Sequence, residues 1–125
     1  MNPHVLALDD DAAIRELIAD YLAQNDLRIT TVADGQEFEA VMARETVDMV
    51  VLDVRLQGED GMQIARKLRE QSAIPILMLT GRAEEADRVM GLELGAYDVL
   101  SKPLVTRDIA RALAGALHAE RKEAA

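Results

Sequence analysis

Four short apolar runs, each followed at once by a polar side chain, constrain the fold of this 125-residue chain most strongly. The runs cover residues 5–8, 49–52, 76–79 and 99–100. Each predicts a strand that is buried on both faces, as the strands of a parallel sheet are. A fifth and more polar run over about residues 28–32 predicts one further strand, at the edge of the sheet.

Between these runs, apolar residues recur at helical spacing. The first helix is predicted over about residues 12–24, and its apolar stripe consists of Ile14, Leu17, Ile18, Tyr21 and Leu22. Further apolar stripes predict four more helices: one after Asp34, one around 64–68, one over about 86–94 that is ended by Gly95, and one from Thr106. The stripe of the helix over 86–94 includes Val89 and Met90.

The alternation of strands and helices predicts an α/β fold of one domain. Crossovers between parallel strands are right-handed, so helices cover both faces only if the strand order reverses. We therefore predict a doubly wound five-stranded parallel sheet in the flavodoxin-like order 2-1-3-4-5, with helices on both faces.

The polar residues at the strand ends form a candidate site. Asp9 and Asp10 follow the first strand, Asp53 the third, Thr80 the fourth and Lys102 the fifth. The carboxyl ends of parallel strands share one edge, so these groups are predicted to meet there. Grouped carboxylates call for a divalent cation, predicted as Mg²⁺, and a hydroxyl and an ammonium suit phosphoryl oxygens. The predicted chemistry is transfer of a phosphoryl group to the carboxylate of Asp53, supported by Thr80 and Lys102.

Each of these residues has a simpler interpretation when it is taken alone. An aspartate after a strand is most often a turn residue or a helix cap, and acids favour the N-terminus of a helix. A threonine before a glycine and a lysine before a proline are ordinary loop and surface residues. Their joint occurrence at successive strand ends is what favours a site. His4 and His118 have no such partners and are predicted to lie on the surface.

Composition excludes several classes of function. The net charge of −9 argues against direct nucleic-acid binding, which needs a basic face. Without cysteine there is no disulfide or thiolate metal site. No basic leader and no apolar run long enough to span a membrane are present, so we expect no membrane partner and a cytoplasmic location.

Taken in order, four segments closely resemble the receiver domain of two-component response regulators, the CheY-like fold. They are VLALDDD at 5–11, VLDVRLQGEDG at 51–61, ILMLTG at 76–81 and LSKP at 100–103. The resemblance covers essentially the whole chain. It implies Asp53 as phosphoacceptor, Asp9 and Asp10 as the acidic pair, and Thr80 and Lys102 as phosphate and signal contacts.

The resemblance also implies a cofactor, partners and an output surface. Asp9, Asp10, Asp53 and the backbone carbonyl of Arg55 would hold Mg²⁺, and a sensor histidine kinase would supply the phosphoryl group. The fourth helix, fifth strand and fifth helix would form the output surface. Such a domain is not an enzyme and catalyses only its own phosphorylation and dephosphorylation.

The segment DRVMGLELGA at 87–96 resembles the fourth helix of OmpR/PhoB-type regulators, which carry a C-terminal DNA-binding output domain. Residues 1–125 would then be a receiver domain, either stand-alone or excised from such a regulator. Phosphorylation would allow a homodimer on the output surface. Two positions depart from the family pattern, because Val99 stands where an aromatic residue is usual and Ala112 where an arginine is usual.

The alternative function is a haloacid-dehalogenase-like phosphohydrolase, which also uses a strand-end aspartate, a hydroxyl, a lysine and Mg²⁺. That family requires a second acid two residues after the nucleophile, where this chain has Arg55, and a nucleophile after the first strand, whereas Asp53 follows the third. A purely structural adaptor of the same fold is a second alternative, against which the intact set of acids argues.

Overall fold

The computed structural model describes residues 3–80, 85–101, 108, 111, 112, 114 and 115. Its main sheet has five parallel strands in the order β2-β1-β3-β6-β7. The strands are β1 (His4–Leu8), β2 (Arg28–Val32), β3 (Met49–Asp53), β6 (Ile76–Thr80) and β7 (Asp98–Ser101). Counted as the first to fifth strands of this sheet, they have the predicted order 2-1-3-4-5.

Four helices have described bounds, and each of the first three begins at a carboxylate that accepts from a free backbone N–H group. They are α1 (Ala12–Ala23), α2 (Gly35–Arg44), α3 (Gly61–Gln71) and α4 (Glu85–Leu94). Asp11, Asp34 and Asp60 cap the first three with their carboxylates. Gly95 follows α4 with a φ of +99°, which confirms its predicted place just after the helix. Most of the predicted fifth helix lies outside the described residues, but Asp108, Arg111, Ala112, Ala114 and Gly115 are helical.

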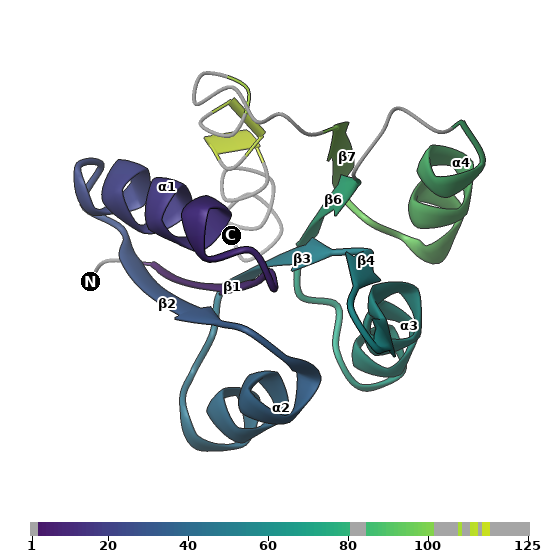
Figure 1. Ribbon diagram of the computed structural model, residues 1–125, viewed down its shortest axis with the longest axis horizontal. Helices are drawn as coiled ribbons and strands as arrows, with labels where there is room; N and C mark the ends of the chain where they lie inside the picture. The colour runs from purple at the N-terminus through teal and green to yellow at the C-terminus, as the bar shows by residue number, and fades with distance from the viewer. Residues whose placement is uncertain (1–2, 81–84, 102–107, 109–110, 113, 116–125) are drawn as a thin grey trace.

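The sheet separates two hydrophobic cores, so the doubly wound architecture is confirmed. On one face, Ile18 and Leu22 of α1 pack with Ala112 against Val5 and Leu77. On the other face, buried residues of α2 and α3 pack against β1, β3 and β6. Figure 1 shows α1 on one side of the sheet and α2 and α3 on the other. Parallel strands buried in this way explain the continuous apolar runs of the sequence.

Helix α4 approaches the sheet through a glycine. A Cβ on Gly91 would lie 2.9 Å from both the Met78 sulfur and a Val99 methyl carbon, so no larger side chain fits without a shift. Val89 and Met90, which the predicted stripe would have packed inward, are each 43% exposed. The helix therefore turns Gly91 toward the sheet and leaves apolar side chains in solvent.

His4 is buried, so the prediction that it lies on the surface is wrong. It is 2% exposed. Its Nδ1 lies 2.8 Å from the Thr46 carbonyl oxygen, and its Nε2 lies 2.8 Å from the Thr30 hydroxyl. A carbonyl only accepts, so Nδ1 carries a proton. The ring thus joins β1 to β2 and to the segment before β3. His118 lies outside the described residues.

Within the described part of the chain, no helix is both long enough and apolar enough to cross a membrane.

Candidate phosphoacceptor and metal site

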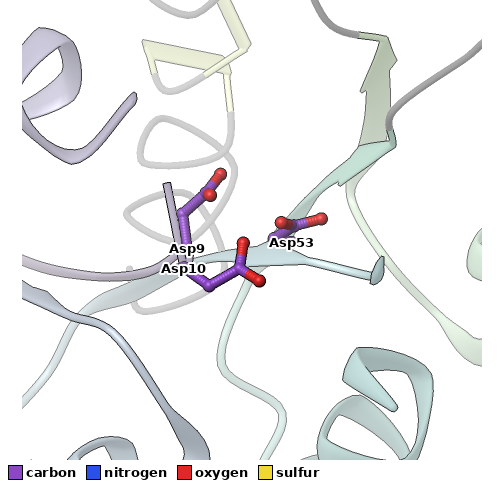
Figure 2. Close-up of side chains that lie close together, drawn as sticks. All are labelled: Asp9, Asp10 and Asp53. Carbon is purple, nitrogen blue, oxygen red and sulfur yellow. The ribbon is translucent and has the colours of Figure 1, made fainter. Parts of the chain in front are cut away.

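Three carboxylates meet at the carboxyl edge of the sheet, as the sequence predicts. Asp9 and Asp10 follow β1, and Asp53 ends β3, the strand beside it. One oxygen from each residue lies within 4.8 Å of the others. Asp9 and Asp53 are each 1% exposed, whereas Asp10 is open to solvent. Figure 2 shows the Asp9, Asp10 and Asp53 side chains grouped close together.

A backbone N–H group orients each of these carboxylates. Asp9 accepts a hydrogen bond from the Asp11 amide at 2.9 Å, and Asp53 accepts one from the Arg55 amide at 3.0 Å. Asp10 accepts one from the Gln57 amide at 2.8 Å, across 47 residues of sequence. Such charge-assisted bonds hold the acids in place despite their mutual repulsion.

The donor set fits a hard divalent cation. Carboxylate oxygens at this spacing, with one acid open to water, suit Mg²⁺, which binds to few protein oxygens and keeps several waters. Asp9, Asp10 and Asp53 are the groups that would hold the ion. A role for the Arg55 carbonyl, implied by the resemblance, stays a prediction.

Thr80 reaches the same edge from the other side of Asp53. It ends β6 and is 2% exposed. The register pairs Asp53 with Leu79, and the Val54 amide donates to the Leu79 carbonyl at 3.0 Å. Thr80 therefore lies one residue beyond Leu79, the neighbour of Asp53 on β6. Lys102 lies outside the described residues, one position after the Ser101 that pairs with Thr80.

A short hairpin after Asp53 was not predicted from the sequence. Strands β4 (Arg55–Leu56) and β5 (Glu59–Asp60) pair in antiparallel fashion and lead directly into α3. The glycine at 58 has a φ of +74°, which allows the tight turn between them. A glycine before a pair of acids gives some indication of a turn, but the pairing itself has no periodic signal.

Gly61 lets this hairpin return against the backbone of Asp53 and Val54. Its amide donates to the Val54 carbonyl at 3.2 Å, and a Cβ there would overlap the Asp53 carbonyl oxygen and lie 2.7 Å from the Val54 Cα. Both neighbours are backbone, so neither can turn away.

We expect Gly61→Ala to lower the free energy of unfolding by about 1–3 kcal/mol, because overpacking must move the backbone. Chemical denaturation measures this loss. Gly58→Ala is the matched control, because a Cβ at this position would have open space around it. Its free energy of unfolding should fall only by the roughly 1–2 kcal/mol that a left-handed backbone costs a residue with a Cβ. A stability of Gly61→Ala equal to that of the parent would show that the loop relaxes freely.

The family model described as "Response regulator receiver domain" matches residues 5–114. The chain belongs to the response regulator receiver family. Among curated relatives, the regulatory protein VirG of Agrobacterium fabrum (strain C58) is 49% identical over 106 residues. The match covers 84% of this chain and 42% of VirG, so the chain spans less than half of that relative.

Solved structures of receivers agree with this assignment. The chemotaxis response regulator CheY4 of Vibrio cholerae superposes with a TM-score of 0.85 at 29% identity, covering 94% of this chain and all of that one. The receiver domain of the response regulator TorR gives a TM-score of 0.86 at 31% identity, covering 90% and 94%. The chain is thus a receiver domain of the kind found in two-component signal transduction, as its four sequence segments suggest.

Proposed function

We propose that this receiver accepts a phosphoryl group from a sensor histidine kinase on the carboxylate of Asp53, in a reaction that needs Mg²⁺. The observation that carries the proposal is the buried Asp53 carboxylate at the end of the central strand, within 4.8 Å of both Asp9 and Asp10. An aspartate that only caps a helix or forms a turn would not require two further carboxylates beside it.

In the proposed step an oxygen of Asp53 attacks the phosphorus of the donor. The bond from phosphorus to Asp53 forms as the bond from phosphorus to the donor atom breaks, and the donor leaves with that electron pair. Bound Mg²⁺ would supply positive charge between the carboxylates and the phosphoryl oxygens. Thr80 would donate its hydroxyl hydrogen to one phosphoryl oxygen, and Lys102 would neutralise another. The chain's own part is positioning and charge stabilisation.

Transfer to the domain's own aspartate, without turnover of an external substrate, means that the protein is not an enzyme in the usual sense. A haloacid-dehalogenase-like hydrolase is disfavoured because Arg55 occupies the position where that family has its second acid. In this structure Arg55 is the first residue of β4. A small donor such as acetyl phosphate separates the alternatives. With Mg²⁺ a receiver gains one labile phosphoryl group, a hydrolase turns the donor over, and an adaptor does neither.

The output surface is proposed on α4, β7 and the fifth helix. Apolar side chains exposed there are Val89, Met90, Leu92 and Tyr97. Beside them, Tyr97, Asp98, Asp108 and Arg111 line a shallow depression. We propose that phosphorylation makes this surface available to a second copy of the chain or to an output domain. The matched region is 42% of VirG. We propose a cytoplasmic location for this domain, which suits a kinase partner.

Tyr97 does not face the same side as Val99, although the alternation of side chains along a strand predicts that residues two positions apart share a face. Val99 contacts the Gly91 position of α4, whereas the Tyr97 hydroxyl lies against Gly115. Alternation fails because Tyr97 precedes β7, which begins at Asp98. We expect Tyr97 to keep its rotamer on activation, because it is not placed to follow Thr80. Structures without and with beryllofluoride on Asp53 would check this, and a large change in the Tyr97 rotamer would contradict it.

Slow dephosphorylation is a further expectation. Arg55 lies two residues after Asp53 with an exposed side chain, and Arg82, outside the described residues, lies two after Thr80. Either cation can screen and pair with the phosphoryl group. Arg55→Ala should shorten the phosphoprotein's lifetime by about two- to fivefold, the size of a solvent-exposed ion pair. The lifetime is measured by following the loss of the phosphoryl group in the intact-protein mass. Arg44→Ala, at the far end of α2, is the control. An unchanged or longer lifetime would reject the idea.

A further inference from the structure

A carboxylate on the hairpin after Asp53 joins that hairpin to the start of α2. Both carboxylate oxygens of Glu59 lie 3.1 Å from the Gly35 amide nitrogen, which donates to them. The helix already has its own cap, because Asp34 accepts a hydrogen bond from the Glu37 amide at 2.9 Å. The Glu59 contact is therefore not needed to begin α2, and its main structural consequence is to fix the hairpin.

The same hairpin holds one of the three clustered acids. Gln57, at its turn, donates its amide hydrogen to an Asp10 carboxylate oxygen at 2.8 Å. Leu56 and Glu59 are paired across the hairpin, and Gln57 and Gly58 form the turn between them. Only Gly58 separates Gln57 from Glu59 in the sequence. A displacement of Glu59 would therefore move the amide that orients Asp10.

The hairpin needs such an anchor. Its strands have only two residues each, and an isolated two-stranded hairpin is at best marginally stable. Gly58 has no atom within 4 Å of the place where a Cβ would be, so packing at this residue does not hold the turn. Buried Leu56 secures one strand, and the Glu59 contact to α2 adds to the Asp60 cap of α3 in securing the other.

We propose that Glu59 is a positioning residue for the metal site: by holding the hairpin to the Gly35 amide, it keeps the Gln57 N–H on Asp10 and so preorganises that carboxylate for Mg²⁺. The inference rests on the proposed Mg²⁺-dependent function. Residues that orient a metal ligand through hydrogen bonds commonly tune affinity without touching the ion.

Gly35 allows the contact to be broken without removing charge. A Cβ at this position would lie 2.5 Å from a Glu59 carboxylate oxygen, the flexible end of a side chain that can swing away. Its next neighbour is the Ile64 Cδ1 at 3.3 Å. Gly35 is not among the described residues with positive φ, so alanine fits its backbone and favours the helix. Gly35→Ala should expel Glu59 and leave α2 intact.

The test compares Gly35→Ala, Glu59→Ala and the double variant with the parent, and uses Glu70→Ala, an exposed acid of α3, as the matched loss of charge. Mg²⁺ is titrated while amide resonances are followed by NMR. Both single variants should bind Mg²⁺ about three- to tenfold more weakly, as expected for loss of one supporting hydrogen bond, and the double variant should be no weaker than Glu59→Ala. Glu70→Ala should match the parent.

Phosphorylation kinetics give a second readout. With acetyl phosphate, the Mg²⁺ concentration for half-maximal rate should rise in both variants by the same factor, while the rate at saturating Mg²⁺ stays that of the parent. A merely structural defect would lower the saturated rate as well. Weaker binding in Glu59→Ala together with parent-like binding in Gly35→Ala would assign the effect to charge alone and overturn the proposal.

A metal-free measurement separates this inference from the function on which it rests. If the parent failed to bind Mg²⁺, the proposed function would be wrong. The Gln57 amide proton, without metal, would still report its bond to Asp10. An upfield shift of that proton in both Gly35→Ala and Glu59→Ala supports the link through the hairpin, and an unchanged shift in either refutes it.

Discussion

Asp53→Asn should take up no phosphoryl group from acetyl phosphate and Mg²⁺, while the parent gains one. The amide of asparagine is a poor nucleophile, so the acceptor is removed outright. The fold should survive, because the side-chain oxygen of the introduced asparagine can still accept the hydrogen bond that the Arg55 amide gives to Asp53. Intact-protein mass measures the label, and circular dichroism checks the fold.

The control for this variant is Asp20→Asn, on the exposed side of α1, which should be labelled like the parent. If Asp53→Asn were labelled as fully as the parent, another residue would be the acceptor and the assignment of Asp53 would be wrong.

Asp10→Asn should be more stable than the parent without metal and should lose the stabilisation by Mg²⁺. Three carboxylates within 4.8 Å repel one another, and two of them are buried, where repulsion is poorly screened. Removing one charge should raise the free energy of unfolding by about 1 kcal/mol, or the thermal midpoint by roughly 3–6 °C for a domain of this size. The substitution keeps an oxygen that can accept from the Gln57 amide.

For the parent, Mg²⁺ at about ten times its dissociation constant should add roughly 1.4 kcal/mol by mass action. Differential scanning calorimetry with Mg²⁺ and with a chelator measures both effects. Asp20→Asn should respond to Mg²⁺ as the parent does. A parent midpoint that does not move with Mg²⁺ would count against the site, and so would a full Mg²⁺ response in Asp10→Asn.

Local patterns in the sequence were enough to predict the sheet and the acids. The runs at 49–52 and 76–79 are apolar without interruption because β3 and β6 are buried on both faces. Strand order followed from connection geometry, and the carboxyl edge then brought Asp9, Asp10 and Asp53 together. Each of these steps needs only the spacing of residue types along the chain.

Contacts between distant segments were not predicted. His4 is polar and near the N-terminus, and only the fold places Thr30 and Thr46 around its ring. The bond from Gln57 to Asp10 and the bond from Gly35 to Glu59 join residues 47 and 24 positions apart. Such bonds depend on loop conformation, which has no periodic signal in a single sequence. The orientation of Tyr97 was also not predictable in this way, because strand alternation does not extend to Tyr97, one residue before β7.

The most direct test of the account is to map the label on the parent. The protein is incubated with acetyl phosphate and either Mg²⁺ or a chelator, the acyl phosphate is trapped by borohydride reduction, and the modified residue is found by peptide sequencing in a mass spectrometer. One modified residue, Asp53, is expected in the Mg²⁺ sample and none in the chelated sample. Modification at another residue, or equal modification of Asp53 without Mg²⁺, would contradict it.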